Sequence, residues 1–226
     1  MPSSTAPATA ALDPAGLEAV LEVMSTARAM RHFHPDPVPD EVVTAMVHAA
    51  TRAPSGKNAQ PWAFVAIRDE AVRREVGALY REAWYETMPQ TMQHPTEKEW
   101  ELRGRRDWEY LANHMGDAPL LVLVCYVPQP HDSMPDAPSA EESAGSLYPA
   151  IQNLLLAARA YGVGGCLTTV HQAREEPIKR LLGVPDEVET VALIPMGYPL
   201  RSFGPVSRKP LAEVGHWDRW GVVMGG

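Results

Sequence analysis

The sequence predicts an α+β fold, in which strands and helices alternate without the regular strand–helix–strand repeat of a doubly wound sheet. Apolar, β-branched runs at 62–67, 119–127 and 188–195 are typical of buried strands. In most of the chain between these runs, apolar residues recur at helical spacing, which predicts helices. The glycines at 162–165 follow a predicted helix, whereas the dinucleotide-binding fingerprint follows a strand. These observations favour α+β over a dinucleotide-binding α/β fold.

The composition indicates one globular domain. The chain has 226 residues, enough for a substantial core, and we expect a disordered tail at 1–11 and a single domain at 12–226. A formal net charge of -8 with dispersed Lys and Arg argues against nucleic-acid and membrane partners. Two cysteines without a CxxC spacing, and a start without a signal-peptide pattern, favour the cytoplasm. No apolar run reaches the roughly 18 residues needed to span a bilayer.

Helix signals are clear in the first third of the chain. Asp13 and Pro14 can start a helix that continues toward Arg28. A second helix is expected from Asp40 to Arg52, where Pro54 stops it. Asp69 can cap a third helix that runs to about residue 86.

The middle of the chain is less regular. Residues 88–116 show no clean period, so 84–118 is expected to be an excursion from the core. We expect this excursion to be a substrate lid, or alternatively a surface helical hairpin with its aromatic residues packed on the body; its aromatic residues include Trp84, Trp100, Trp108 and Tyr110. The Pro-rich stretch 128–142 is expected to be a mobile loop. A long helix at 143–161, a short strand at 166–170 and a helix at 175–182 follow.

The segment 53–62 joins a helix end to an apolar strand through short polar residues. Ser55, Asn58 and Gln60 offer hydrogen-bond donors and acceptors, and Gly56 leaves the backbone free to bend. Such a loop can wrap a ligand. The same composition also fits an ordinary capped turn.

Three separated segments together resemble the FMN-dependent nitroreductase family. They are Arg28-Ala29-Met30-Arg31-His32-Phe33, then Pro54-Ser55-Gly56-Lys57-Asn58-Ala59-Gln60-Pro61-Trp62, and a long stretch from Tyr148 to Thr169. Ser207-Arg208-Lys209-Pro210-Leu211 is similar to the closing basic segment of the family. The resemblance implies an α/β/α sandwich with a central mixed, mainly antiparallel sheet. It also implies a homodimer that associates through long helices and holds FMN at the subunit interface.

The resemblance assigns the cofactor phosphate to Arg28 and Arg208, since arginine offers a permanently charged planar fork. Arg31 matches a position whose cation lies near flavin N1 and O2, where it favours the reduced ring. Ala29 stands where a serine is frequent, and Val206 where many relatives carry a basic residue. Both departures remove a phosphate donor, unless a residue such as Lys209 compensates.

The remaining cofactor contacts implied by the resemblance come from two segments. One supplies Pro54, Ser55, Gly56 and Asn58, reaching across from the partner subunit. The other lies near flavin N5 and comprises Gly165, Leu167, Thr168 and Thr169. A threonine hydroxyl there can donate to the flavin, or Thr168 and Thr169 can simply be β-formers.

Other reactive side chains have weaker signals. Cys166 has no adjacent base, so a packed thiol is expected rather than a nucleophile. His171 is a candidate proton donor or a structural residue of the next helix. No His/Cys/Asp cluster has metal-ligand spacing, so no metal is expected.

The implied function is an FMN-dependent oxidoreductase that takes hydride from NADPH or NADH and reduces nitroaromatics, quinones or similar electron-poor acceptors by a ping-pong mechanism. Within the family the alternatives are ene reductase, dehydrogenase, deiodinase-like, flavin-fragmenting or deazaflavin-using activities. An alternative of another class is a flavin-binding redox protein without rapid turnover.

Overall fold

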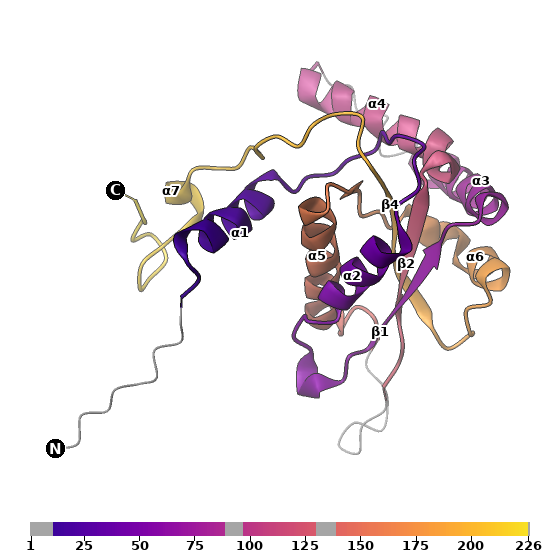
Figure 1. Cartoon of the computed structure of the whole chain (residues 1–226), viewed down its shortest axis with the longest axis horizontal. Coiled ribbons are helices and arrows are strands. Elements are labelled where there is room, and N and C mark those ends of the chain that lie inside the picture. The colour runs from indigo at the N-terminus through magenta and orange to yellow at the C-terminus, as the bar shows by residue number, and fades with distance from the viewer. Residues whose placement is uncertain (1–10, 89–96, 130–138, 226) are drawn as a thin grey trace. The chain divides into compact units, whose positions relative to one another are not determined.

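The computed structural model describes residues 11–88, 97–129 and 139–225 (Figure 1). The chain divides into two compact units, residues 27–202 and the two terminal stretches ending at Thr26 and beginning at Phe203. The prediction that 12–226 form a single domain stays a prediction. Residues 1–10 of the expected tail at 1–11 and most of the expected loop at 128–142 lie outside the described residues.

The larger unit is built on a four-stranded sheet in the order β1-β2-β4-β3. The strands are β1 (Trp62–Ile67), β2 (Leu120–Tyr126), β4 (Glu189–Gly197) and the two-residue β3 (Gly164–Gly165). All three ladders are antiparallel, and one isolated bridge, between Ala29 and Gly165, is parallel. The α+β prediction is therefore confirmed.

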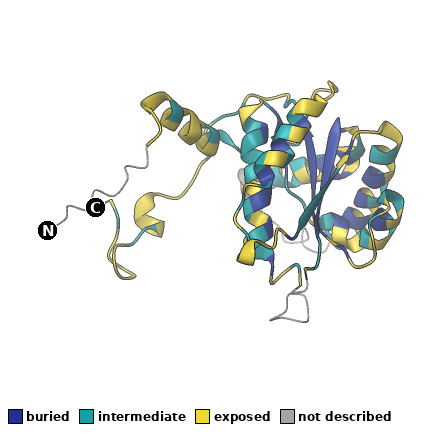
Figure 2. Ribbon diagram, turned by 60° about the horizontal axis from the view of Figure 1, so that its bottom comes forward, coloured by how far each residue is buried: buried dark blue, intermediate teal, exposed yellow. Residues whose placement is uncertain are grey.

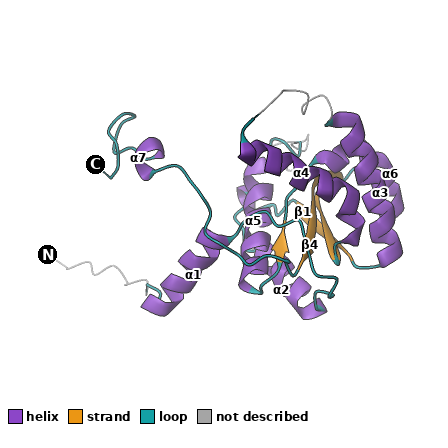
Figure 3. Cartoon of the chain, turned by 90° about the horizontal axis from the view of Figure 1, so that it is seen from above, coloured by secondary structure: helices purple, strands orange, loops and turns teal. Residues whose placement is uncertain are grey.

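Helices cover both faces of this sheet (Figures 1 and 3). Helices α2 (Asp40–Ala50) and α5 (Ala144–Ala160) pack on one face, and α3 (Glu70–Thr87) and α6 (Glu175–Leu182) on the other. Side chains of β2 alternate between the two cores: Leu120, Val122 and Val124 face α2 and α5, whereas Leu121 and Leu123 face α3. Every residue of β2 is buried (Figure 2), as expected for the central strand of a three-layer sandwich.

Part of the expected excursion at 84–118 is a regular helix, α4 (Glu99–His114), which agrees with the helical alternative, while the lid stays a prediction. Its Leu111 and Ala112 belong to the core beside α3 and are the buried side chains among the described residues of α4. The strand expected at 166–170 is wrong: the strand β3 lies just before it, and within 166–170 there is one bridge, from Thr168 to Leu193, before the 3-10 helix that begins at Val170.

Residues 29–34 form an extended strap between β3 and the chain that follows β4. The Met30 amide donates to the Gly165 carbonyl (3.0 Å), and the His34 amide donates to the Tyr198 carbonyl (2.8 Å). The Leu200 amide in turn donates to the His32 carbonyl (3.0 Å). The strap is thus fixed on both sides by backbone hydrogen bonds.

This close approach requires glycine in β3. A Cβ atom added to Gly164 would lie 2.8 Å from Cβ and Cγ of Met30, closer than non-bonded carbons can pack. Because hydrogen bonds to Gly165 hold the Met30 backbone in place, the strap has little freedom to move away.

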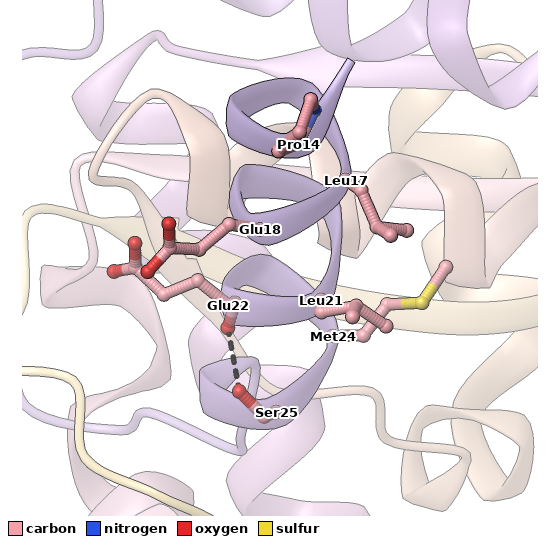
Figure 4. Close-up of a pocket in the computed structure, with 7 residues that line it drawn as sticks. All are labelled: Pro14, Leu17, Glu18, Leu21, Glu22, Met24 and Ser25. Carbon is pink, nitrogen blue, oxygen red and sulfur yellow. Dashed lines mark hydrogen bonds between the residues drawn. The ribbon is translucent and has the colours of Figure 1, made fainter. Parts of the chain in front are cut away.

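The smaller unit contains α1 (Pro14–Thr26) and the short α7 (Leu211–Val214). The Val206 amide donates to the Ser25 carbonyl (2.9 Å) and joins its two stretches. No residue of α1 is buried, and Leu17, Leu21 and Met24 project from one side of the helix while Glu18 and Glu22 project from the other (Figure 4). Large apolar side chains are also exposed near the C-terminus, among them Trp217 and Trp220.

We predict that Gly164→Ala lowers the free energy of unfolding by about 1 to 3 kcal/mol, the usual cost of overpacking a tight contact. Gly145→Ala in α5 is the matched control, because a Cβ there meets nothing within 4 Å. Its stability should be unchanged or raised by up to about 1 kcal/mol, since alanine favours helix. Urea unfolding measures both variants. Equal stabilities for the two would show that the strap does not need this glycine.

Candidate functional site

Two adjoining pockets of the larger unit share Arg31. The first, the aromatic pocket, has a volume of about 280 Å³ and is lined by Arg31, Tyr80, Trp84, Met88, Trp108, Leu111, Cys166, Leu167, Thr168, Thr169 and Val170. The second, the cationic pocket, has a volume of about 150 Å³ and is lined by Arg28, Ala29, Met30, Arg31, His32, Asp107, Arg201 and Ser202. An apolar recess thus meets a strongly basic one at a single guanidinium group.

The strap and its neighbours position these walls. Arg28 directly precedes the parallel bridge between Ala29 and Gly165, so the strap lies beside the chain that continues into 166–170. Helix α3 supplies Tyr80 and Trp84 on successive turns of one face. Helix α4 contributes Asp107, Trp108 and Leu111.

Arg31 is a half-buried cation with unused hydrogen-bonding capacity. Its Nε is buried and has no hydrogen-bond partner among the described residues. Its guanidinium group also contacts the Cys166 thiol, whose pKa is raised by burial although Arg31 opposes that shift. Cys166 therefore stays a neutral, packed thiol, as the sequence predicts.

Tyr80 and Thr168 both line the aromatic pocket. The Thr168 hydroxyl donates to the Leu193 carbonyl (3.0 Å), so its single hydrogen is used. Burial raises the pKa of Tyr80 to about 12, which keeps the phenol protonated.

His171 is fully buried and lines neither pocket. Burial lowers the pKa of His171 to about 4, and Glu175 only partly opposes this shift. Both ring nitrogens lack a hydrogen-bond partner within the described part of the chain. Of the two roles considered for His171, the structural one therefore fits, because a neutral imidazole outside the pockets is a poor proton donor.

The structure brings together only some of the residues singled out from the sequence. Arg28, Ala29, Arg31, Leu167, Thr168 and Thr169 line the two pockets, and Gly165 is bridged to Ala29. Trp84, only 6% exposed, and Trp108 line the aromatic pocket.

Other predicted site residues lie elsewhere. Tyr110 is outside both linings and is stacked between His32 (ring centroids 3.8 Å apart) and His114 (4.3 Å). Trp100 falls within α4, and Arg208 belongs to the smaller unit, which is described by itself.

The polar loop at 54–60 lines neither pocket. It precedes Trp62, which pairs with Tyr126 at one end of β2, whereas Leu120 at the other end pairs with Met196, the partner of Gly165. Six steps along β2 at about 3.4 Å each separate these ends by about 20 Å. Pro54, Ser55, Gly56 and Asn58 therefore lie at the opposite end of the sheet from β3 in the same chain.

The loop also stores backbone strain. Lys57, Asn58 and Gln60 have φ angles of 52°, 57° and 51°, in the left-handed region that costs a non-glycine residue roughly 1 to 2 kcal/mol. The Ser55 hydroxyl accepts from the Gln60 amide (3.0 Å), and the Ser146 hydroxyl of α5 accepts from the Gly56 amide (3.2 Å). Such strained, braced loops are concentrated at functional sites.

Sequence reasoning missed Tyr80, Asp107, Arg201 and Ser202 as pocket residues. Tyr80 lies four residues after Val76 in the third predicted helix, so its spacing alone indicates an apolar stripe that packs on the core. Arg201 belongs to no recognised motif, and its position follows only from the pairing of residues 198–200 with the strap.

Among the described residues, no group of three or more His, Cys, Asp or Glu side chains is arranged to hold a metal ion. None of the described helices is long and apolar enough to cross a membrane.

Comparison with known proteins identifies the family. The nitroreductase family model matches residues 24–198, and the chain belongs to this family of oxidoreductases. It is 30% identical over 175 residues to an iodotyrosine deiodinase from Thermotoga neapolitana, covering 76% of this chain and 84% of that protein.

Solved structures agree with this assignment. An oxidised iodotyrosine deiodinase bound to FMN and 3-iodo-L-tyrosine is 25% identical with a TM-score of 0.67, covering 84% of this chain and 95% of that one. The FMN-dependent nitroreductase NfnB from Mycobacterium smegmatis in complex with NADPH is 20% identical with a TM-score of 0.67, covering 90% and 99%. The predicted family and fold are confirmed.

We predict that His171 makes stability fall in mild acid. Between the ordinary pKa of 6.5 and about 4, the unfolded chain protonates this imidazole and the folded chain does not, so the free energy of unfolding decreases as the pH falls. The full shift corresponds to about 3 kcal/mol, of which about 2 kcal/mol appears by pH 5. His171→Leu should remove this part of the decrease, and His48→Gln on the exposed surface of α2 should keep it. Denaturant unfolding at pH 7 and pH 5 measures the difference, and identical pH dependence of all three proteins would contradict it.

Proposed function

We propose that this protein is a homodimeric, FMN-dependent NAD(P)H oxidoreductase whose acceptors are flat, electron-poor molecules such as nitroaromatics or quinones. The observation that carries the proposal is the junction of an aromatic pocket with a cationic pocket at Arg31. An isoalloxazine ring with a phosphate tail has the same two parts, a flat apolar body and an anion. Family membership and the FMN in the related deiodinase structure support this assignment.

The residues present fit FMN. The unpartnered Nε of Arg31 suits the electron-rich N1 and O2 edge of the ring, and Arg28 suits the phosphate. Leu167 and Thr169 offer a wall along the ring, with Gly165 behind them in β3. The Thr168 hydroxyl already donates to Leu193, so of the two threonines Thr169 is the one whose hydroxyl is available for the flavin.

Bound FMN supplies hydride acceptance and donation at N5. Arg31 holds a fixed positive charge that favours an electron-rich ring, and its position is maintained by the strap. Tyr80 keeps its proton because its pKa is about 12, so no negative charge from this phenol opposes that effect. Trp84 and Trp108 form apolar walls that exclude water and let a flat acceptor stack over the ring.

A second candidate is reductive removal of iodide from a phenolic substrate. The 30% identity to the Thermotoga deiodinase favours it, and the volume of the aromatic pocket, about 280 Å³, is compatible with a single-ring substrate. Both candidates use the same proposed cofactor, and they differ in the acceptor.

We predict that the purified protein binds FMN and not FAD, since the described pockets offer an anion site and no second nucleotide site. NADPH or NADH should bleach the flavin within seconds in a stopped-flow instrument, and a nitroarene or quinone should restore the colour. Bleaching by dithionite alone would indicate a flavin-binding protein without turnover. Restoration by 3-iodotyrosine with release of iodide, and not by nitroarenes or quinones, would favour the deiodinase candidate.

The homodimer is supported by the distance between the two predicted halves of the site. About 20 Å of sheet separates 54–58 from β3 in one chain, farther than one flavin ring extends. A second chain that brings its own 54–58 to this pocket would complete the site. Exposed Tyr148 on α5, close to Ser146, and the exposed Leu17, Leu21 and Met24 of α1 offer apolar surface for such an association.

We predict that Tyr148→Glu weakens the dimer and releases FMN together. Tyr148 is 45% exposed, so the new carboxylate is tolerated in a single chain but is costly in an interface. Tyr85→Glu on α3, where the tyrosine is 48% exposed, is the matched control and should leave both properties intact. Sedimentation recorded with flavin fluorescence tests this, and a monomer that retains and reduces FMN would refute the shared site.

A further inference from the structure

The cationic pocket concentrates positive charge in a chain whose formal net charge is -8. Three guanidinium groups, those of Arg28, Arg31 and Arg201, line it together with one carboxylate, that of Asp107. Asp107 faces His32, with 3.5 Å between Oδ1 and Nε2. With a neutral imidazole the pocket therefore carries a net charge of about +2, and like charges held so close repel one another unless an anion lies between them.

The backbone holds Arg201 at this position. The Leu200 amide donates to the His32 carbonyl (3.0 Å), and Phe33 and Pro199 form an antiparallel bridge. Arg201 therefore directly follows the segment 198–200, which is hydrogen-bonded to the strap. Within the described parts of the chain, neither Arg28 nor Arg201 forms an ion pair with a carboxylate.

We propose that Arg201, assisted by Ser202, is a ligand of the FMN phosphate, opposite Arg28. The inference rests on the proposed FMN function and extends it to a residue outside the motifs of the family. A phosphate monoester carries about -1.5 to -2 charges at pH 7, which matches the net charge of the pocket. Its volume, several times the ~30 Å³ of a water molecule, accommodates such a group.

Arg201 and Ser202 can also replace the two phosphate donors that this chain lacks at Ala29 and Val206. Ala29 lines the pocket but has no hydroxyl to donate, and Val206 has no charge. Arg201 supplies a planar fork of N–H donors, and Ser202 supplies the hydroxyl that Ala29 lacks. The chain thus recovers one charged donor and one neutral donor from the segment that pairs with the strap.

Competition between two flavins tests the role of Arg201 directly. Riboflavin has the same ring and ribityl chain as FMN but no phosphate. The purified holoprotein is titrated with riboflavin, and displaced FMN is separated and quantified, which gives the riboflavin concentration for half displacement. In Arg201→Gln this concentration should fall about ten- to hundred-fold, the loss expected for one hydrogen bond between charged groups. In Arg201→Lys the half-displacement concentration should fall less, because lysine keeps the positive charge.

Arg180→Gln is the matched control, an exposed arginine of α6 that lines neither pocket, and should behave as wild type. An unchanged half-displacement concentration in Arg201→Gln would overturn the proposal. The proposal would also be overturned if Arg201→Gln weakened the binding of FMN and of riboflavin equally. In that case FMN would be lost on dilution, but the ratio of the two affinities would not change. A raised KM for NADPH but not NADH, with FMN retention intact, would assign Arg201 to the nicotinamide dinucleotide phosphate instead. Wild-type protein without any flavin would refute the proposed function itself, which is a separate outcome.

Discussion

The candidate site depends on the backbone pairing that holds the strap at 29–34 between two other segments. One side bonds to Gly165 and the other to residues 198–200. The strap can lie so close to the sheet because glycines face it: a Cβ on Gly197 would come within 3.0 Å of Phe33 Cβ, just as one on Gly164 would meet Met30. Arg28, Arg31 and Arg201 share one recess because these hydrogen bonds bring together segments that are more than 150 residues apart.

Charge in the site is carried by arginine, and the buried titratable groups around it remain neutral. Burial raises the pKa of Tyr80 and Cys166 and lowers that of His171, and each shift disfavours the charged form. Arg31 is therefore the one charged side chain among the described residues that line the aromatic pocket. A positive charge held in place in this way suits a ring that becomes electron-rich on reduction.

Local sequence signals located most elements of the core. Strand β1 and helix α6 have the predicted bounds, and the Asp69 side chain caps α3 by accepting from the Val72 amide (3.0 Å). Helix α4 was foreseen only as an alternative, and its bounds were not predicted, because its charged sequence buries Leu111 and Ala112 alone among its described residues and shows no full apolar stripe. Arg28 and Arg31 were found through a motif, but Arg201 enters the pocket through a pairing between distant segments. Such tertiary pairing has no local periodicity from which it can be predicted.

The loop at 54–60 is the feature that most favours the proposed two-chain site. Lys57, Asn58 and Gln60 occupy the left-handed region, which is costly for Lys and Gln and better tolerated by Asn. Hydrogen bonds within the loop and one from the Gly56 amide to the Ser146 hydroxyl brace this conformation. Within its own chain this strained polar loop borders neither described pocket. A strained conformation is retained when it serves a ligand, and the ligand site suited to these donors lies about 20 Å away along the sheet. In the proposed dimer this distance is no obstacle, because the loop of one subunit would face the strap and β3 of the other. If the strap arginines and the partner's loop together hold the proposed cofactor, binding of the cofactor and association of the subunits are linked equilibria, and each strengthens the other.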